Sequence, residues 1–290
     1  YLLMSQIGSV WEFYLFFGVI VGIGMAGTFV PLSSTVARWF AKRRSMMTGI
    51  VTAGEGLGTL LVPPLATLLI HTYEWRVSYL ILGATVLVVV VTAAQFLKRD
   101  PSDMGQYVDG ESEEEQPEVE LADTAFSLWE AVTIKQFWLI CSLLFTTGFC
   151  MLAIVVHIIP LATDSGISAS TAATILAAIG GLGIVGRLVL GGAADRIGIK
   201  RVLIMGLVLM SVSLLWLLHA GELWEFYLFA VIFGLSNGGI NALWSPLVAE
   251  LFGLKSHGLI YGVSELGFTI GAAIGPLMTG YIFDSTGAYT

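Results

Sequence analysis

Eight long apolar segments alternate with short polar stretches along the chain. A hydrocarbon core about 30 Å thick requires about 20 apolar residues per helix, so each segment is long enough to span a bilayer. The segments cover about residues 13–36, 46–70, 77–97, 136–161, 169–193, 201–219, 224–250 and 258–283, and residues 1–8 resemble the end of another span. The pattern predicts an all-α membrane protein with about eight full transmembrane helices.

The composition supports a multi-helix membrane protein. Hydrophobic residues make up 56% of the chain and charged residues 12%, whereas an ordinary soluble protein is about 25% charged. The 34 glycines fit the same class, because small residues let membrane helices approach closely. Cys141 and Cys150 lie about 13 Å apart along one expected helix, too far for a disulfide.

The basic residues between the segments fall almost entirely on one side. Eleven belong to one side and only Arg76 to the other, while Arg187 lies inside a segment. The eleven are Arg38, Lys42, Arg43, Arg44, Lys98, Arg99, Lys135, Arg196, Lys200, Arg201 and Lys255. The positive-inside rule assigns this side to the cytoplasm, so we expect a multi-pass protein of the cell membrane.

The one long polar stretch, residues 98–133, holds most of the acidity. It contains eleven acids against Lys98 and Arg99, a net charge of −9, which leaves +1 for the rest of a chain whose total is −8. Its acidic centre, 111–120, has a composition typical of disorder. We expect a cytoplasmic linker at 98–133 between an N-terminal bundle, 1–97, and a C-terminal bundle, 134–290.

An internal repeat supports two related bundles. The six residues Trp11–Phe16 recur as Trp224–Phe229, an offset of 213, and both copies open a span of the same direction. Glu55 and Glu265 follow inside later spans at an offset of 210. Parallel repeats with a nearly constant offset are typical of two-bundle transporters.

Arg187 lies eight residues before Asp195, which opens a charged turn. Eight helical residues rise about 12 Å, close to the half-depth of about 15 Å of the hydrocarbon core. A cation at that depth is costly and marks a substrate or ion pathway by default. The alternative is a structural arginine that snorkels towards the cytoplasm or pairs with an acid.

The charged turn resembles the loop signature of the major facilitator superfamily. It reads Gly191-x-x-x-Asp195-Arg196-x-Gly198-x-Lys200-Arg201. The resemblance implies two six-helix bundles, of which this chain holds the end of helix 3 to helix 11, with helices 1, 2 and 12 absent. It also implies that the loop residues form a conformational latch with neighbouring helix ends; the alternative is simple positive-inside charge.

A narrower resemblance is to the monocarboxylate-porter and oxalate/formate-exchanger branch. It rests on 38–44, Trp75-Arg76, 129–131, 137–139, 157–160, 261–262 and Gly275-Pro276. In that branch an arginine of helix 8 is implicated in carboxylate binding, and Arg187 matches it. Oxalate exchangers carry a lysine in helix 11, and residues 258–283 contain none, which disfavours oxalate.

Two acids lie about ten residues inside their spans, Glu55 and Glu265. Buried carboxylates can exchange protons near neutral pH, so either could couple a proton to the substrate, and Glu55 could pair with Arg187. Hydrogen bonding within a glycine-lined helix contact is the alternative role of both.

Four more residues are candidates for substrate binding. His157, near the outer end of its span, could carry a proton or gate, or simply be solvated. Asn237, Asn241 and Trp244 lie in the helix that corresponds to helix 10 of the family, which lines the cavity, or they could act as interhelical glue.

These features favour a secondary active carrier of a small organic anion, most simply a monocarboxylate, that works by alternating access with possible proton coupling. A carrier of another solute and a non-transporting sensor or scaffold of the same fold are the alternatives. No metal-ligand spacing or nucleophile–base pair indicates an enzyme. We expect no cofactor, no metal and no binding of nucleic acid. We expect a monomer whose partners are the lipid bilayer, a small organic anion and, if transport is proton-coupled, protons.

Overall fold

The computed structural model describes residues 1–110 and 126–287, and every regular element in that part is a helix. Within these described residues, eight helical stretches are long and apolar enough to cross a membrane, as the hydrophobic pattern predicts. The elements are η1 (Leu2–Gln6), α1 (Val10–Phe13), η2 (Tyr14–Val21), α2 (Gly22–Ala26), α3 (Phe29–Trp39), α4 (Arg44–Phe96), η3 (Pro101–Met104), η4 (Val108–Gly110), α5 (Leu128–Val132), α6 (Lys135–Asp164), α7 (Ala169–Ile197), α8 (Ile199–Leu217), α9 (Leu223–Phe252) and α10 (His257–Thr286).

The first span is less regular than its apolar pattern suggests. It runs over Val10–Trp39 as α1, the π-helix η2, α2 and α3. Ser9 caps its start: the Ser9 hydroxyl oxygen accepts a hydrogen bond from the Glu12 N–H, and the Glu12 carboxylate accepts one from the Ser9 N–H. The helix breaks at Gly27 and Thr28, where the backbone leaves the regular helical hydrogen-bond pattern.

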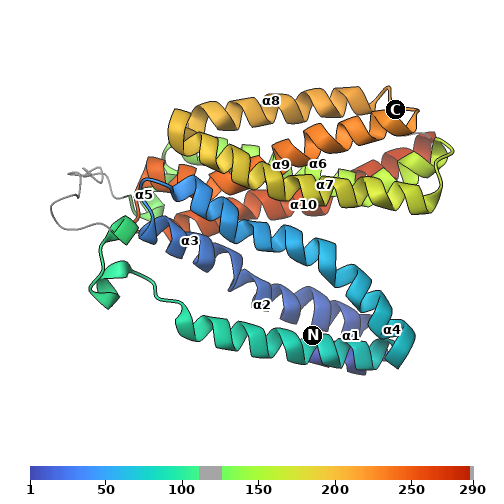
Figure 1. Cartoon of the computed structure of the whole chain (residues 1–290), viewed down its shortest axis with the longest axis horizontal. Helices are drawn as coiled ribbons and strands as arrows, with labels where there is room; N and C mark the ends of the chain where they lie inside the picture. Colours follow the sequence, from blue (N-terminus) through green and yellow to red (C-terminus); the bar gives the residue numbers. More distant parts are fainter. Residues whose placement is uncertain (111–125, 288–290) are drawn as a thin grey trace.

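The long helix α4 is two spans joined by a tight turn. Glu74 adopts φ 69° and ψ 163°, a left-handed region that is strained for a residue with a side chain, and Figure 1 shows the chain reverse direction there. By length and apolarity alone α4 contains the candidate spans Arg44–Val62 and Leu65–Phe96, and the turn at Glu74 lies inside the second of these ranges. The polar turn expected between residues 70 and 77 is therefore present.

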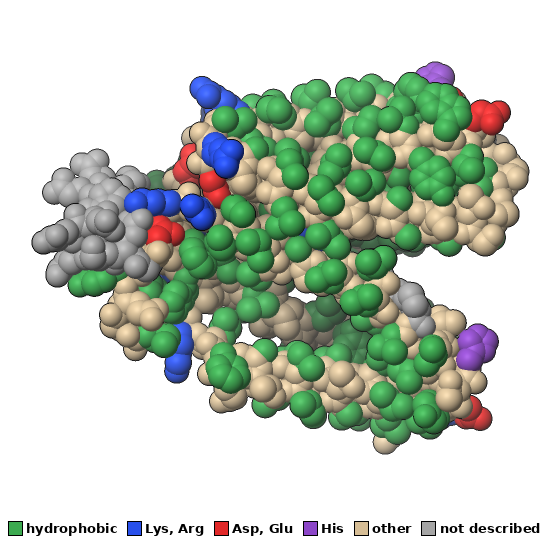
Figure 2. Space-filling view, in the orientation of Figure 1, with side chains coloured by type: hydrophobic (Ala, Val, Ile, Leu, Met, Phe, Trp, Pro, Cys, Tyr) green, Lys and Arg blue, Asp and Glu red, His purple; other side chains and the backbone are tan. Residues whose placement is uncertain are grey.

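Lysines and arginines gather at one end of the molecule, as Figure 2 shows. We call this the basic end; it holds the end of α3, the start of α4, the α7–α8 turn and the start of α10 (Figure 1). The acidic centre of the expected linker, 111–120, lies outside the described residues. The domain boundaries remain a prediction.

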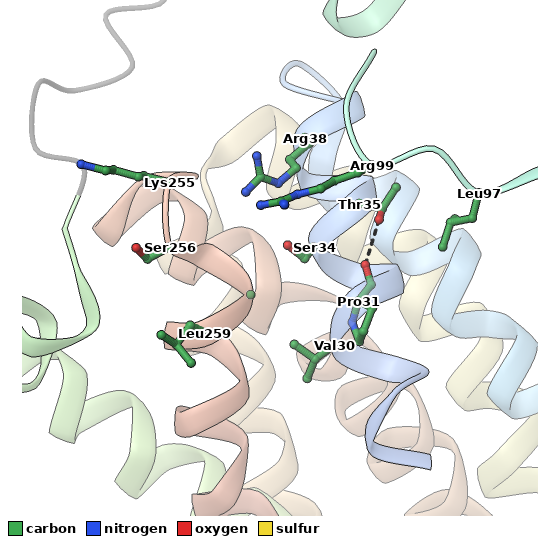
Figure 3. Close-up of a pocket in the computed structure, with 11 residues that line it drawn as sticks. Val30, Pro31, Ser34, Thr35, Arg38, Leu97, Arg99, Lys255, Ser256 and Leu259 are labelled. Atoms are coloured by element: carbon green, nitrogen blue, oxygen red, sulfur yellow. Dashed lines mark hydrogen bonds between the residues drawn. The ribbon is translucent and has the colours of Figure 1, made fainter. Parts of the chain in front are cut away.

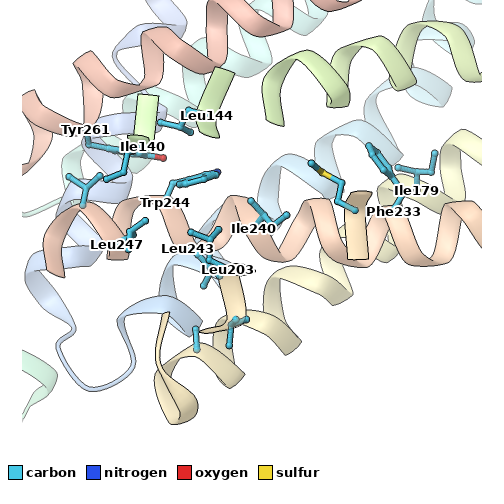
Figure 4. Close-up of a cluster of buried hydrophobic side chains, with 14 of the residues drawn as sticks. Ile140, Leu144, Ile179, Leu203, Phe233, Ile240, Leu243, Trp244, Leu247 and Tyr261 are labelled. Carbon is cyan, nitrogen blue, oxygen red and sulfur yellow. The ribbon is translucent and has the colours of Figure 1, made fainter. Parts of the chain in front are cut away.

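The helices α6–α10 enclose the main hydrophobic core, and α9 is the most deeply buried of them. Figure 4 shows Trp244 and Tyr261 among the aliphatic side chains of this core. Glycines let α7 and α9 pack backbone against backbone: a Cβ on Gly238 would overlap the backbone of Gly183. This close packing fixes α7, and with it Arg187, against α9.

The N-terminal helices meet the C-terminal helices mainly where α4 crosses α7. Gly49 of α4 lies directly against the Arg187 carbonyl, and a Cβ on Gly191 of α7 would lie 2.8 Å from the Ser45 carbonyl oxygen. The crossing is thus built from glycines on both helices, and it lies in the half of the molecule towards the basic end.

Candidate functional site

Arg187 lies at the α4–α7 crossing and is 5% exposed. Its Nη2 donates to Glu55 Oε2 of α4 at 2.6 Å, and the Glu55 side chain is 53% exposed. The Arg187 Nε is buried and has no hydrogen-bond partner in the described part of the chain. The structure therefore brings together the cation and the acid that the sequence suggested as a pair, with one guanidinium donor left to bind another acceptor.

Glycine on α4 makes room for this ion pair. A Cβ on Gly56, one residue after Glu55, would lie 3.1 Å from Arg187 Nη1. A side chain at position 56 would first clash with Ile184 Cγ1, at 2.5 Å, and would also crowd the guanidinium. The Gly54-Glu55-Gly56 sequence therefore places the carboxylate beside the arginine while keeping the helix surface flat enough for α7.

Glu265 belongs to the same region of the bundle interface. It lies on α10, four residues after Tyr261, and it is within electrostatic range of the Tyr261 hydroxyl and of Glu55. Glu55 of α4 is thus paired with a cation on α7 and lies within electrostatic range of a second acid on α10. Such a set can bind an anion and hold a proton.

The hydrogen bonds observed for the other sequence-predicted binding residues do not involve Arg187, and the Trp244 Nε1 is buried without a partner in the described part of the chain. Asn241 Nδ2 donates to the Asn237 carbonyl at 2.9 Å within α9, and Trp244 is 1% exposed inside the core of Figure 4. His157 Nε2 lies 3.0 Å from the Pro276 carbonyl oxygen, which ties α6 to α10. A substrate-binding role for these four residues stays a prediction.

Asp195 joins the two bundles at the basic end. Its Oδ1 accepts from Ser45 N–H and its Oδ2 from Met46 N–H, each at 2.9 Å. These are backbone donors of the first turn of α4, which have no partner inside their own helix. Asp195 therefore caps a helix of the other bundle, and a role of this contact as a conformational latch stays a prediction.

The remaining residues of the loop signature take different positions. Gly191 permits the close approach described above, and Gly198 turns the chain with φ +95°. The side chains of Arg196, Lys200 and Arg201 are exposed at the basic end. Their part in the latch remains a prediction.

Arg38 makes contacts that the sequence did not predict. Its Nη1 donates to Asp100 at 3.0 Å and its Nη2 to the Leu254 carbonyl at 2.9 Å, so it bridges α3, the chain after α4 and the α9–α10 turn. Asp109 similarly accepts from the N–H groups of Ala41 and Lys42. Backbone partners carry no sequence signal, although Asp100 and Asp109 were visible as acids of the linker.

A cavity of about 630 Å³ opens beside Arg38. Figure 3 shows it between α3 and α10, with Arg99 and Lys255 at its rim and Val30 and Leu259 on its walls. It lies at the basic end and is separate from the Arg187–Glu55 pair.

The family model described as "Major Facilitator Superfamily" matches residues 1–198 and 155–290. The chain belongs to this superfamily. The match, together with the helical architecture, confirms the fold class inferred from the sequence and the expectation that the protein is not an enzyme.

Relatives with curated names support the narrower branch. Monocarboxylate transporter 12 of Rattus norvegicus is 29% identical over 308 residues, which cover 97% of this chain and 63% of the relative. Monocarboxylate transporter 11 of Homo sapiens is 30% identical over 288 residues, covering 96% and 58%. An uncharacterized MFS-type transporter, YhjX, of Escherichia coli (strain K12) is 28% identical over 264 residues, covering 88% and 61%.

These alignments confirm the resemblance to the monocarboxylate-transporter branch. They also show that the chain spans less than two thirds of the length of these relatives. The chain is thus a multi-pass membrane protein of a transporter family, with a bilayer as its surroundings.

Proposed function

We propose that the full-length protein is a secondary active carrier of a small organic anion, a monocarboxylate, that works by alternating access. The observation that carries this proposal is the buried Arg187 guanidinium, paired with Glu55 at the contact between two bundles. The names of the relatives in the monocarboxylate-transporter branch support the same substrate class.

The proposed binding step is an exchange of carboxylates. The planar guanidinium of Arg187 can hold a substrate carboxylate through two parallel donors, one of which, Nε, is available. The substrate then competes with Glu55 for Nη2. In this scheme either Glu55, once displaced from Arg187, or Glu265 carries the coupled proton.

The arrangement of contacts supports alternating access. The hydrogen bonds of Asp195 and Arg38 between the bundles lie at the basic end, whereas the opposite end is hollowed between the two groups of helices in Figure 2. We infer a state closed at the basic end, which we assign to the cytoplasm. The basic end can open only when the contacts of Asp195 and Arg38 break. The proposed binding site at Arg187 would then face each side of the membrane in turn.

The test is uptake of labelled pyruvate or lactate into proteoliposomes that contain the full-length protein, with an imposed pH gradient. Saturable uptake that the gradient accelerates supports a proton-coupled monocarboxylate carrier. Uptake of only uncharged solutes would favour a carrier of another class, and absence of any flux across a solute panel would favour a sensor or scaffold. Light scattering of the purified protein tests whether it is a monomer.

A further inference from the structure

The cavity between α3 and α10 combines positive charge with an apolar wall. Its volume of about 630 Å³ lies within the range of about 300–1,000 Å³ found for ligand pockets. The cations that line it are Arg38, Arg99 and Lys255, and the apolar side chains are those of Val30, Pro31, Leu97 and Leu259. The cavity therefore suits a ligand with an anionic part and an apolar part.

Two arginines of the N-terminal part of the chain lie together at this cavity. Arg38 Nη1 is 3.0 Å from Asp100 Oδ1, and Arg99 Nε is 3.6 Å from Asp100 Oδ2, so one carboxylate joins both guanidinium groups. Lys255 stands on the opposite rim, where Figure 3 shows its ammonium group pointing outwards, and Glu130 is within electrostatic range of it. Three cations against these two acids leave the rim positive.

Hydrogen-bond donors at this rim lack acceptors. Arg38 donates through Nη1 to Asp100 and through Nη2 to the Leu254 carbonyl, whereas its Nε is buried without a partner in the described part of the chain. A buried donor without an acceptor is costly. Helix α10 also begins at this cavity without a side-chain cap, since the Ser256 hydroxyl accepts from none of its first N–H groups. Both features favour the oxygens of an anion at this end.

The polarity of the cavity changes along the helices. Val30 precedes Arg38 by eight residues on α3, a rise of about 12 Å, and Leu259 lies in the first turn of α10. Figure 3 shows Val30 and Leu259 further along the helices than the guanidinium groups. Leu259 is 57% exposed, so the apolar part opens towards the surroundings, which are a bilayer for this chain.

A phospholipid has the same order of groups. Its phosphate lies at the membrane interface and its acyl chains extend from there into the hydrocarbon. Basic pockets between transmembrane helices on the cytoplasmic side bind acidic headgroups, whereas the choline ammonium of a zwitterionic lipid would add a further cation to this rim. A soluble phosphate would leave the apolar walls facing water, which is unfavourable.

We propose that this cavity binds an acidic phospholipid of the leaflet at the basic end, with the phosphate at Arg38 and Arg99 and an acyl chain against Val30 and Leu259. The walls come from both groups of helices, because α3 and Arg99 belong to the N-terminal part and α10 to the C-terminal part. The bound lipid therefore ties the two parts together and stabilises the state closed at the basic end. This second part rests on the proposed alternating access.

Native mass spectrometry of the detergent-solubilised full-length carrier tests the binding, with phosphatidylglycerol and phosphatidylcholine as the added lipids. We expect tighter binding of phosphatidylglycerol, and a loss of about fivefold in its affinity for each cation removed, in Arg99→Gln and in Lys255→Gln. The control is Lys98→Gln, which removes an exposed cation outside the lining. Equal phosphatidylglycerol affinities in the unaltered carrier and all three variants would overturn the proposal and leave the cavity to another segment of the full-length carrier.

A second pair of variants tests the apolar part of the site. Leu259→Asn should weaken phosphatidylglycerol binding about tenfold, since a buried apolar contact is lost. Leu266→Asn is the matched control, because Leu266 lies on the same helix, is also 57% exposed and is outside the cavity lining. Equal effects of the two substitutions would contradict the placement of the acyl chain.

The source of the phosphate is tested by competition. Glycerol 3-phosphate carries a phosphate without acyl chains, so it should not displace phosphatidylglycerol from the carrier. Displacement by glycerol 3-phosphate at a concentration equal to that of the lipid would identify a site for soluble phosphates and overturn the assignment to a lipid.

Pulsed electron spin resonance tests the effect on the closed state. Spin labels on Arg43→Cys and Arg201→Cys, both exposed, report the separation of the two groups of helices after Cys141 and Cys150 are replaced by serine. Proteoliposomes of phosphatidylcholine and phosphatidylglycerol in equal parts should show a smaller long-distance population than phosphatidylcholine alone, and Lys255→Gln should weaken this response. Unchanged distances would overturn the role in closure. A carrier that binds phosphatidylglycerol but moves no solute would instead refute the proposed function and leave the lipid site supported.

Discussion

Arg187 offers a carboxylate a planar pair of donors that lysine cannot provide, although both carry one positive charge. Loss of one charge-assisted hydrogen bond of about 1.5–3 kcal/mol corresponds to a roughly ten- to hundredfold weaker affinity. We therefore expect Arg187→Lys to raise the Kd for pyruvate by that factor and Arg187→Ala to abolish uptake, as measured by equilibrium binding and proteoliposome flux. Near-normal pyruvate transport by Arg187→Ala would make the arginine structural.

Glu55 is the acid that pairs with Arg187 in the empty site, so its neutral analogue should separate binding from coupling. Glu55→Gln cannot exchange a proton, and we expect pyruvate-driven proton movement to disappear while pyruvate–pyruvate exchange persists. The control is Glu74→Gln, because Glu74 is exposed at the far turn of α4. Unchanged pH-dependent uptake in Glu55→Gln and in Glu265→Gln would exclude both acids from coupling.

Between helices, the contact that holds the proposed closed state is the cap of α4 by Asp195, which depends on the close approach at Gly191. Adding a methyl group there should push α7 away from Ser45, since the new Cβ would lie 2.8 Å from the Ser45 carbonyl oxygen. A helix cap is worth about 1 kcal/mol, a shift of about fivefold between states. We therefore expect Gly191→Ala to enlarge the population with long distances by about that factor. Pulsed electron spin resonance between labels on Arg43→Cys and Arg201→Cys, both exposed positions, measures it after Cys141 and Cys150 are replaced by serine.

The neighbouring Gly192 provides the matched control for this element. A Cβ at Gly192 would meet nothing within 4 Å, so Gly192→Ala should leave both the distances and the uptake unchanged. Equal effects of the two substitutions would mean that helix propensity, rather than the α4–α7 contact, is responsible.

At the scale of the whole molecule, the fold followed from the sequence because hydropathy alone locates membrane helices. The pairing of Arg187 with Glu55 followed from two charges in apolar spans and the helix arrangement implied by the family. The backbone partners of Asp195 and Arg38 could not be predicted in this way. They are the N–H groups of Ser45 and Met46 and the carbonyl of Leu254, and such groups occur along the whole chain. The break at Gly27 likewise interrupts a continuous apolar run, which has no signal of its own.

The orientation of the whole molecule is the remaining property that the charge distribution predicts. Eleven of the basic residues fall on one side of the spans, and insertion machinery retains such loops in the cytoplasm. In a carrier with Cys141 and Cys150 replaced by serine, Gly110→Cys should therefore react with an impermeant maleimide only after the cells are opened, and Gly221→Cys in intact cells. Three candidate spans, α6, α7 and α8, lie between the two positions. Because three is an odd number, the two positions should face opposite sides of the membrane. Labelling of both positions from outside would contradict the number of spans between them, whereas Gly110→Cys labelled in intact cells with Gly221→Cys protected would reverse the assignment of the basic end to the cytoplasm.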